Sequence, residues 1–184
     1  MRILGISGSL RRGSHNRRLL RAVENALPPG ADLVEWDGLA GLPAFDEDEE
    51  NSPPEAVQDL LDAIDSADAV LIATPEYNAS LPGGLKNALD WASRPFPDNV
   101  LRHKPVAVMG ASTGLFGAVW AQAELRRVLQ AAGAHVVDEE LAVPSAHEAF
   151  DDGGDLRDTA QREALAVITG QLLEAAAAPL QRAA

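Results

Sequence analysis

Cysteine is absent from this sequence of 184 residues, tyrosine occurs once, and aromatic residues make up only 4%. Without cysteine the chain can form no disulfide, no thiolate metal site and no cysteine nucleophile. Basic residues are also scarce, with 15 against 28 acidic ones, and the net charge of −13 disfavours nucleic acid or an anionic membrane as a partner. No apolar stretch reaches the roughly 20 residues of a membrane span, and the apolar run after Met1 is too short for a signal peptide. We therefore expect a cytoplasmic protein.

The few basic residues are concentrated near the N-terminus. Six of the 15 lie within the first 21 positions, namely Arg2, Arg11, Arg12, Arg17, Arg18 and Arg21. A local positive field in an acidic protein suits a small anionic ligand. The four histidines, by contrast, are scattered along the chain without the spacing of metal ligands, so we expect no metal site.

Strand-like and helix-like patterns alternate along the chain. Strands are predicted at Arg2–Ser7, Asp32–Trp36, Asp68–Thr74, Pro105–Gly110 and Ala134–Val137. Helices are predicted at Asn16–Leu27, Pro54–Ser66, Leu81–Ala92, Leu115–Ala132 and Asp158–Ala178. The third and fourth strands are nearly continuous apolar runs, typical of parallel strands covered on both faces. The alternation predicts one three-layer α/β domain over residues 1–184, ending in a frayed, alanine-rich tail after Glu174.

The most informative pattern lies between the first strand and the first helix. The apolar run ends at Ser7, and glycines, hydroxyl residues, arginines and an amide follow over Gly8–Asn16. Backbone N–H groups at a helix N-terminus have no intrahelical partner, and the helix dipole adds positive charge there. Such a loop is therefore suited to hold a phosphate. The alternative is a polar turn in which Ser14 or Asn16 only caps the helix.

Two further loops follow the third and fourth predicted strands. Because ligands of doubly wound folds bind outside the carboxyl ends of the strands, we expect residues 8–16, 75–82 and 111–117 to converge. Tyr77 offers a stacking surface for a flat ring, and Asn78 offers both donors and an acceptor. The helix after the third loop would direct N–H donors and a positive dipole at the same cleft. The alternatives are a rigid turn in the second loop and a simple helix cap, by Ser112 or Thr113, in the third.

Taken in order, the segments Gly8–Asn16, Thr74–Trp91 and Ser112–Gly114 resemble the NAD(P)H-dependent FMN reductase family, which includes quinone, chromate and azo-dye reductases. The resemblance extends over roughly residues 1–150, and its most specific part is Pro75–Asn78 with the following Leu85–Trp91. It implies a flavodoxin-like, three-layer α/β fold. The sheet would hold five parallel strands in the order 2-1-3-4-5, with helices on both faces.

The resemblance also implies which residues hold the cofactor. The FMN phosphate would be bound by residues of the first loop, with Leu10 alongside: Ser9, Arg11, Ser14 and Asn16. The isoalloxazine ring would be lined, largely through the backbone and the Asn78 side chain, by Pro75, Glu76, Tyr77 and Asn78. The third loop would approach the ring with Ser112, Thr113 and Gly114. One departure is the bulky run that replaces a more glycine-rich segment of the family, with Leu115, Phe116 and Trp120.

By this resemblance, the protein transfers hydride from NADPH or NADH to FMN and on to a quinone-like, chromate, azo or free-flavin acceptor. The flavin carries the reaction, so no catalytic side chain is expected. Two other functions stay open, a flavodoxin-like FMN electron carrier that does not oxidise nicotinamide, and a binding protein for another phosphorylated ligand. Relatives commonly associate, and we expect a homodimer or homotetramer.

Overall fold

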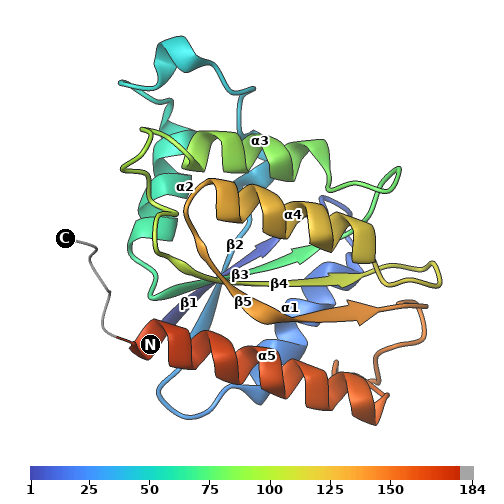
Figure 1. Ribbon diagram of the computed structural model, residues 1–184. Coiled ribbons are helices and arrows are strands. Elements are labelled where there is room, and N and C mark those ends of the chain that lie inside the picture. The colour runs from blue at the N-terminus through green and yellow to red at the C-terminus, as the bar shows by residue number, and fades with distance from the viewer. Residues whose placement is uncertain (179–184) are drawn as a thin grey trace.

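The computed structural model describes residues 1–178, which form a parallel sheet between two layers of helices (Figure 1). The strands are β1 (Arg2–Ser7), β2 (Asp32–Trp36), β3 (Ala69–Thr74), β4 (Pro105–Ala111) and β5 (His135–Val143). The helices are α1 (His15–Ala26), α2 (Glu55–Asp65), α3 (Gly83–Ala92), α4 (Val119–Ala131) and α5 (Thr159–Ala177), with short 3₁₀ turns η1 (Gly38–Gly41) and η2 (Glu47–Glu49). The five strands run parallel in the order β2-β1-β3-β4-β5, which confirms the predicted topology.

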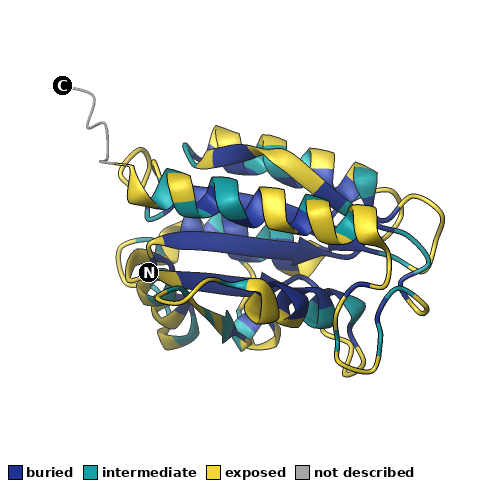
Figure 2. Cartoon of the chain, turned by 90° about the horizontal axis from the view of Figure 1, so that it is seen from below, coloured by how far each residue is buried: buried dark blue, intermediate teal, exposed yellow. Residues whose placement is uncertain are grey.

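The sheet separates two apolar cores. Helices α1 and α5 cover one face, and α2, α3 and α4 cover the other (Figure 1). Successive strand residues point to opposite faces, so Ile3 of β1 packs in the first core while Leu4 and Ile6 pack in the second. Every residue of β3 and β4 is buried, as their continuous apolar runs require. Figure 2 shows these buried strands between helices whose outer faces are exposed.

The fourth long helix begins later than predicted, at Val119 and not at Leu115. The chain is left-handed at Gly117 (φ +60°) and Ala118 (φ +67°), which prevents a continuous helix there. A Cβ atom on Gly117 would lie 2.6 Å from the backbone nitrogen of Val143, so only glycine lets the loop pass so close to β5. Leu115 therefore belongs to the β4–α4 loop, where its side chain is exposed.

The fifth strand is longer than the predicted Ala134–Val137, because β5 continues to Val143. An exposed, charged run at 138–140 interrupts the apolar pattern from which the strand was predicted. Such a run is tolerated because β5 is an edge strand, and its pairing with β4 shifts register between Val106 and Val108. Beyond the irregularity the strand returns to the core and reaches the third loop.

The C-terminal helix lies within one residue of the predicted Asp158–Ala178 at each end. Helix α5 continues to Ala177, so the chain does not fray directly after Glu174. The rest of the predicted tail, residues 179–184, lies outside the described residues. Within residues 1–178 no helix combines the length and the apolar character needed to cross a bilayer.

Candidate functional site

The three predicted loops meet at the carboxyl ends of β1, β3 and β4. The Gly8 N–H donates to the Ala73 carbonyl at 2.8 Å, and a Cβ on Gly8 would lie 3.2 Å from Cδ of Pro75. The first and third loops are joined by the side chain of Asn16. Its Nδ2 donates to the Ala111 carbonyl at 3.0 Å, and its Oδ1 accepts from the Ala111 N–H at 2.9 Å. The structure thus brings all the predicted site residues to one edge of the sheet.

Asn16 is held more tightly than the sequence indicates. Its side chain is buried. Its Oδ1 and one Nδ2 hydrogen pair with the N–H and the carbonyl of Ala111, as the backbone of a neighbouring strand would. We therefore assign to Asn16 the role of joining two loops. Its direct contact with a phosphate stays a prediction.

The first loop presents donors around a capped helix start. Ser14 is the N-cap of α1, since its Oγ accepts from the Arg17 N–H at 3.2 Å. The Oγ of Ser9 accepts from the Arg11 N–H at 3.4 Å, and both serines are buried. The N–H groups of His15 and Asn16, at the start of α1, have no intrahelical acceptor. Leu10, Arg11 and Arg12 are exposed, and no ion pair involves either arginine within residues 1–178. This donor set fits a phosphate ester.

The second loop is a two-residue hairpin. The backbones of Tyr77 and Ser80 exchange two hydrogen bonds of 3.1 Å, and the two residues between them are left-handed, Asn78 at φ +54° and Ala79 at φ +59°. Such a turn usually carries Asn-Gly, so the Asn-Ala pair did not reveal it in the sequence. The hairpin exposes Tyr77 and Asn78, while Pro75 before it is buried.

The third loop folds back onto the end of β5. The Ser112 N–H donates to the Val143 carbonyl at 3.0 Å, and the Gly114 carbonyl accepts from the Ser145 N–H at 3.1 Å. Within the loop, the Gly114 N–H donates to Oγ of Ser112 at 3.1 Å, so this hydroxyl stabilises the turn and does not cap α4. Thr113 and Gly114 are exposed.

The N-terminus of α4 does not direct all its donors at the cleft, as the sequence analysis predicted. The N–H groups of Trp120 and Ala121 both donate to Oε2 of Glu76, each at 3.1 Å. For these two donors the prediction is wrong, because a carboxylate of the second loop already accepts them. Glu76 therefore has a side-chain role that sequence reasoning missed.

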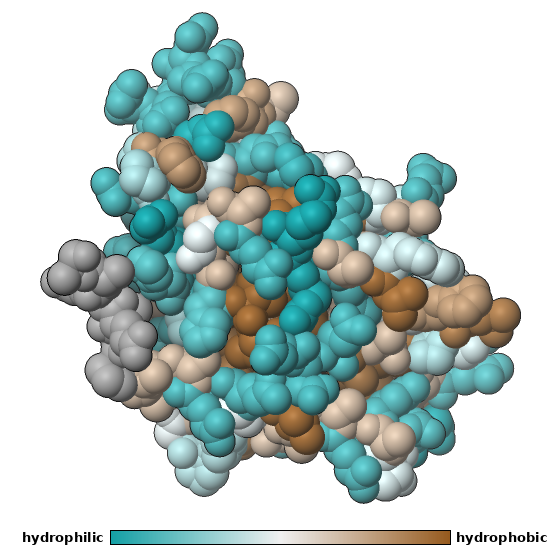
Figure 3. Space-filling view, viewed as in Figure 1, coloured by the Kyte–Doolittle hydropathy of each residue, from teal (hydrophilic) through white to brown (hydrophobic). Residues whose placement is uncertain are grey.

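Exposed apolar side chains lie on the second and third loops and on the first turn of α4. Phe116 and Trp120 form an edge-to-face pair with ring centroids 5.0 Å apart, and they are 58% and 49% exposed. Leu115 is 81% exposed and Tyr77 54% exposed. In Figure 3 hydrophobic residues gather at the right, where the β4–α4 loop of Figure 1 projects. We call Tyr77, Leu115, Phe116 and Trp120 the apolar rim.

His15 is a partly buried histidine in the first turn of α1. Its pKa is lowered from 6.5 by burial and then by the charges of Arg11, Arg18 and His147. No partner within residues 1–178 accepts from or donates to its Nδ1. The imidazole is therefore neutral near pH 7 and adds no fixed charge to the loop.

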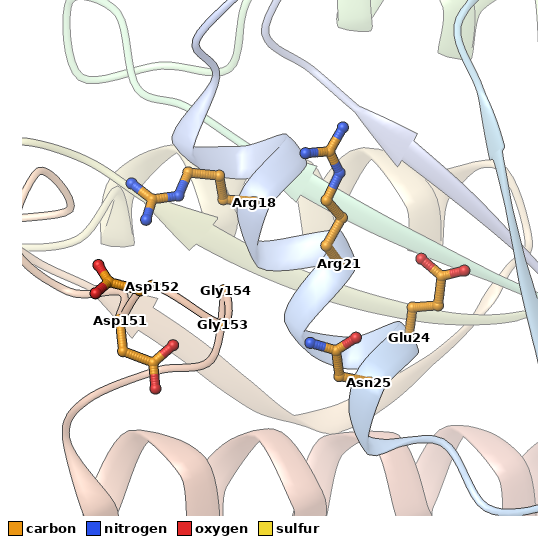
Figure 4. Close-up of a pocket in the computed structure, with 8 residues that line it drawn as sticks. All are labelled: Arg18, Arg21, Glu24, Asn25, Asp151, Asp152, Gly153 and Gly154. Atoms are coloured by element: carbon orange, nitrogen blue, oxygen red, sulfur yellow. The ribbon is translucent and has the colours of Figure 1, made fainter.

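A separate hollow of about 350 Å³ lies between α1 and the segment before α5 (Figure 4). Its lining residues carry charges of both signs: Arg18, Arg21, Glu24, Asn25, Asp151, Asp152, Gly153 and Gly154. Arg18 also packs over the ring of Phe150, with its guanidinium carbon 4.6 Å from the centroid. Since three carboxylates accompany the two arginines, this hollow does not select for a phosphate, and we place the candidate site at the three loops.

Several known proteins are similar to this chain in sequence and in structure. The family model described as NADPH-dependent FMN reductase matches residues 1–148. An NAD(P)H-dependent FMN reductase from Pseudomonas aeruginosa is 45% identical over 166 residues, covering 89% of this chain and 88% of that protein. A quinone reductase from Escherichia coli is 40% identical over 131 residues, covering 70% of this chain and 69% of that protein. The solved structure of FerB, a flavoenzyme NAD(P)H:(acceptor) oxidoreductase from Paracoccus denitrificans, superimposes with a TM-score of 0.85 at 34% identity, covering 95% of this chain and 96% of that one.

Proposed function

This chain belongs to the NADPH-dependent FMN reductase family, and from that premise we propose that its three converging loops hold FMN for the reduction of a quinone. When bound in these loops, FMN would supply the redox chemistry that takes hydride from NADPH or NADH and delivers it to the acceptor. The observation that carries the proposal is the meeting of a phosphate-suited helix start with two exposed loops at one sheet edge.

The first loop would hold the phosphate of FMN. Arg11 is free to form a bidentate contact, and the N–H groups of the first turn of α1 add donors and the positive end of the helix dipole. Ser9 and Ser14 contribute hydroxyls beside it, and Leu10 lies in the same loop. A Cβ built on Gly13 meets no atom within 4 Å, so the loop is open at that point.

The other two loops would hold the ring. Pro75, Glu76, Tyr77 and Asn78 line it from one side, chiefly through their backbone, and Ser112, Thr113 and Gly114 approach it from the other. These groups orient the ring and exclude water from it, and no side chain is assigned a proton transfer.

The apolar rim supports a quinone as the acceptor among the candidate classes. Tyr77, Phe116 and Trp120 present aromatic surfaces beside the loops, and flat apolar rings pack well against such surfaces. Two similar proteins are named for quinone substrates, the quinone reductase of Escherichia coli and a 2-hydroxy-1,4-benzoquinone reductase from a Burkholderia species, which is 43% identical over 128 residues.

We also propose that the protein is cytoplasmic and that it self-associates through this rim. Exposed large apolar side chains grouped in one place commonly mark an interface. In a homodimer or homotetramer the most exposed of these side chains, Leu115, would be covered by a neighbouring subunit. Sedimentation at micromolar concentration tests this, and a monomer would contradict it.

Spectroscopy of the purified protein tests the function. We expect the visible absorbance bands of oxidised flavin, their bleaching by NADPH or NADH without any partner protein, and their return on adding benzoquinone. A flavin-bearing protein that neither nucleotide bleaches would instead be an electron carrier. A colourless protein without affinity for FMN would favour a different phosphorylated ligand.

A pair of arginine variants locates the phosphate. Arg11→Ala should weaken FMN binding by about tenfold or more, because a charge-assisted contact to phosphate is lost. Arg21→Ala is the matched control, since Arg21 is an exposed arginine further along α1. Equal FMN affinity in the two variants would contradict the assignment.

A further inference from the structure

Helix α4 is completed by a side chain from a distant part of the sequence. Its N-cap residue, Ala118, has no side-chain oxygen with which to accept a hydrogen bond from the first turn. The carboxylate of Glu76 accepts instead, from the N–H groups of Trp120 and Ala121, both at 3.1 Å. Glu76 directly follows Pro75, so the second loop supplies the cap.

The local chain cannot supply this cap itself. Capping serines and aspartates have extended backbone, whereas Ala118 is left-handed and follows a glycine pressed against β5. A negative charge at a helix N-terminus is favoured by the dipole, and hydrogen bonds from N–H groups to a carboxylate are stronger than those between neutral groups. Because the path of the β4–α4 loop over β5 leaves the start of α4 without a local acceptor, Glu76 supplies one.

A second carboxylate repeats the connection one turn along the helix. Oε2 of Glu124, on α4, accepts from Oγ of Ser80 at 2.6 Å and from the Leu81 N–H at 3.4 Å. The hairpin that exposes Tyr77 and Asn78 lies between these two attachments. The second loop and α4 are thus joined on both sides of the hairpin.

The cap also fixes an aromatic residue of the apolar rim. Trp120 is itself one of the two donors to Glu76, and its ring packs against Phe116. Tyr77 is the neighbour of Glu76 in the chain. The contact between Glu76 and α4 therefore determines how far apart the Tyr77 and Trp120 sides of the rim lie.

We propose that Glu76 is a positioning residue of the reductase, which sets the opening between Tyr77 and Trp120 by capping α4. Through this opening the nicotinamide and the quinone would reach the flavin, so the inference rests on the proposed function. Glu76 acts through α4 and takes no part in the reaction itself. The phosphate contact of Arg11 is separate, so loss of the cap changes access and not retention of FMN.

Three variants of the FMN-loaded protein test this role. Glu76→Ala removes the cap, Glu76→Gln keeps an oxygen that can accept but removes the charge, and Glu163→Ala removes an exposed carboxylate of α5 as the matched control. Amide hydrogen exchange of Trp120 and Ala121 reports the cap directly, in both the apoprotein and the loaded protein. Steady-state kinetics with NADH and benzoquinone report access, and a flavin titration reports the Kd for FMN.

In Glu76→Ala we expect exchange of both amides to quicken at least tenfold, because two hydrogen bonds to a charged acceptor are lost. The KM values for NADH and benzoquinone should rise about tenfold, with the Kd for FMN changed less than about threefold. Glu76→Gln should recover part of both effects, and Glu163→Ala should match the unmodified protein. If Glu76→Ala does not fold, the intermediate exchange and KM values of Glu76→Gln decide the matter.

Three results would overturn the role of Glu76. Faster exchange with unchanged KM values would make the cap structural only, and raised KM values with unchanged exchange would show that Glu76 does not act through α4. A Kd for FMN raised as far as in Arg11→Ala would place Glu76 in cofactor retention. An unmodified protein that fails to oxidise NADH would instead refute the proposed function, whatever the exchange of these amides.

Discussion

Replacing Asn16 with alanine tests whether this residue binds the phosphate itself or joins the loops that do. In the structure Asn16 engages both the N–H and the carbonyl of Ala111, and both residues are 2% exposed. Truncation would leave these two backbone groups of Ala111 buried without their partner. The loss should therefore be visible in the apoprotein, where no phosphate is present.

The magnitude follows from those two groups. A buried polar group left without its partner costs about 1–3 kcal/mol, and partial hydration of the space vacated by the amide lowers the sum. We expect Asn16→Ala to lower the free energy of unfolding by about 3 kcal/mol. For a chain of this size that corresponds to a melting temperature lower by about 6–12 °C. Ser14→Ala, which removes the cap of α1 and a 3.5 Å contact with the Ser7 hydroxyl, should cost about 1 kcal/mol.

Thermal and urea unfolding of the apoproteins, followed by FMN titration, measures both effects. The reasoning predicts a large loss of stability in Asn16→Ala and weaker FMN binding that follows from the displaced loops. An Asn16→Ala apoprotein that melts within about 2 °C of the unmodified protein, yet has lost its affinity for FMN, would refute it. In that case Asn16 would be a direct phosphate ligand, as the family resemblance implies.

Three further predictions concern the loops and the start of α1. Gly117→Ala should destabilise the apoprotein by about 2 kcal/mol or more in urea unfolding, because its Cβ would lie 2.6 Å from the nitrogen of Val143; a change below about 0.5 kcal/mol would contradict the close passage. Ala79→Gly should stabilise it by about 0.5–1 kcal/mol, since Ala79 is left-handed at φ +59°, whereas Ala123→Gly in α4 should destabilise it by a similar amount. Burial and then neighbouring positive charges lower the pKa of His15 below 6.5, so its contribution to apoprotein stability is complete above that pH and is lost as the pH falls through the lowered pKa. The melting temperature of His15→Gln should therefore fall less than that of the unmodified protein between about pH 7 and pH 5. Parallel curves of melting temperature against pH would show that His15 is not the group responsible.

Local sequence patterns were sufficient to predict the sheet and the position of the site. A continuous apolar run such as Val70–Ala73 favours a parallel strand that is covered on both faces. Two such strands, β3 and β4, form the centre of the sheet. The carboxyl ends of neighbouring parallel strands share one edge, so the convergence of the loops followed from the strand order. Ser14 could be predicted as a cap because capping depends on residues only three apart.

The features that sequence analysis missed depend on contacts between distant residues. Nothing near Glu76 indicates that a helix 44 positions later lacks a cap, because that lack arises from the passage of Gly117 over β5. The bond between Asn16 and Ala111 spans 95 positions and looks in the sequence like a second candidate cap. The charged run in β5 hid the second half of that strand, since an edge strand with a register shift can leave such residues exposed.

These distant contacts divide the site into two parts with different tasks. The first loop is anchored to β3 by Gly8 and to β4 by Asn16, while the second loop is anchored to α4 by Glu76 and Glu124. Neither anchor of the first loop involves α4, so a change in the rim need not displace the groups suited to phosphate. It follows that Phe116 and Trp120 can vary in size without loss of FMN affinity, and that such variation would alter which acceptors enter. This division requires that Phe116→Ala keep its affinity for FMN while its preference shifts toward bulkier quinones.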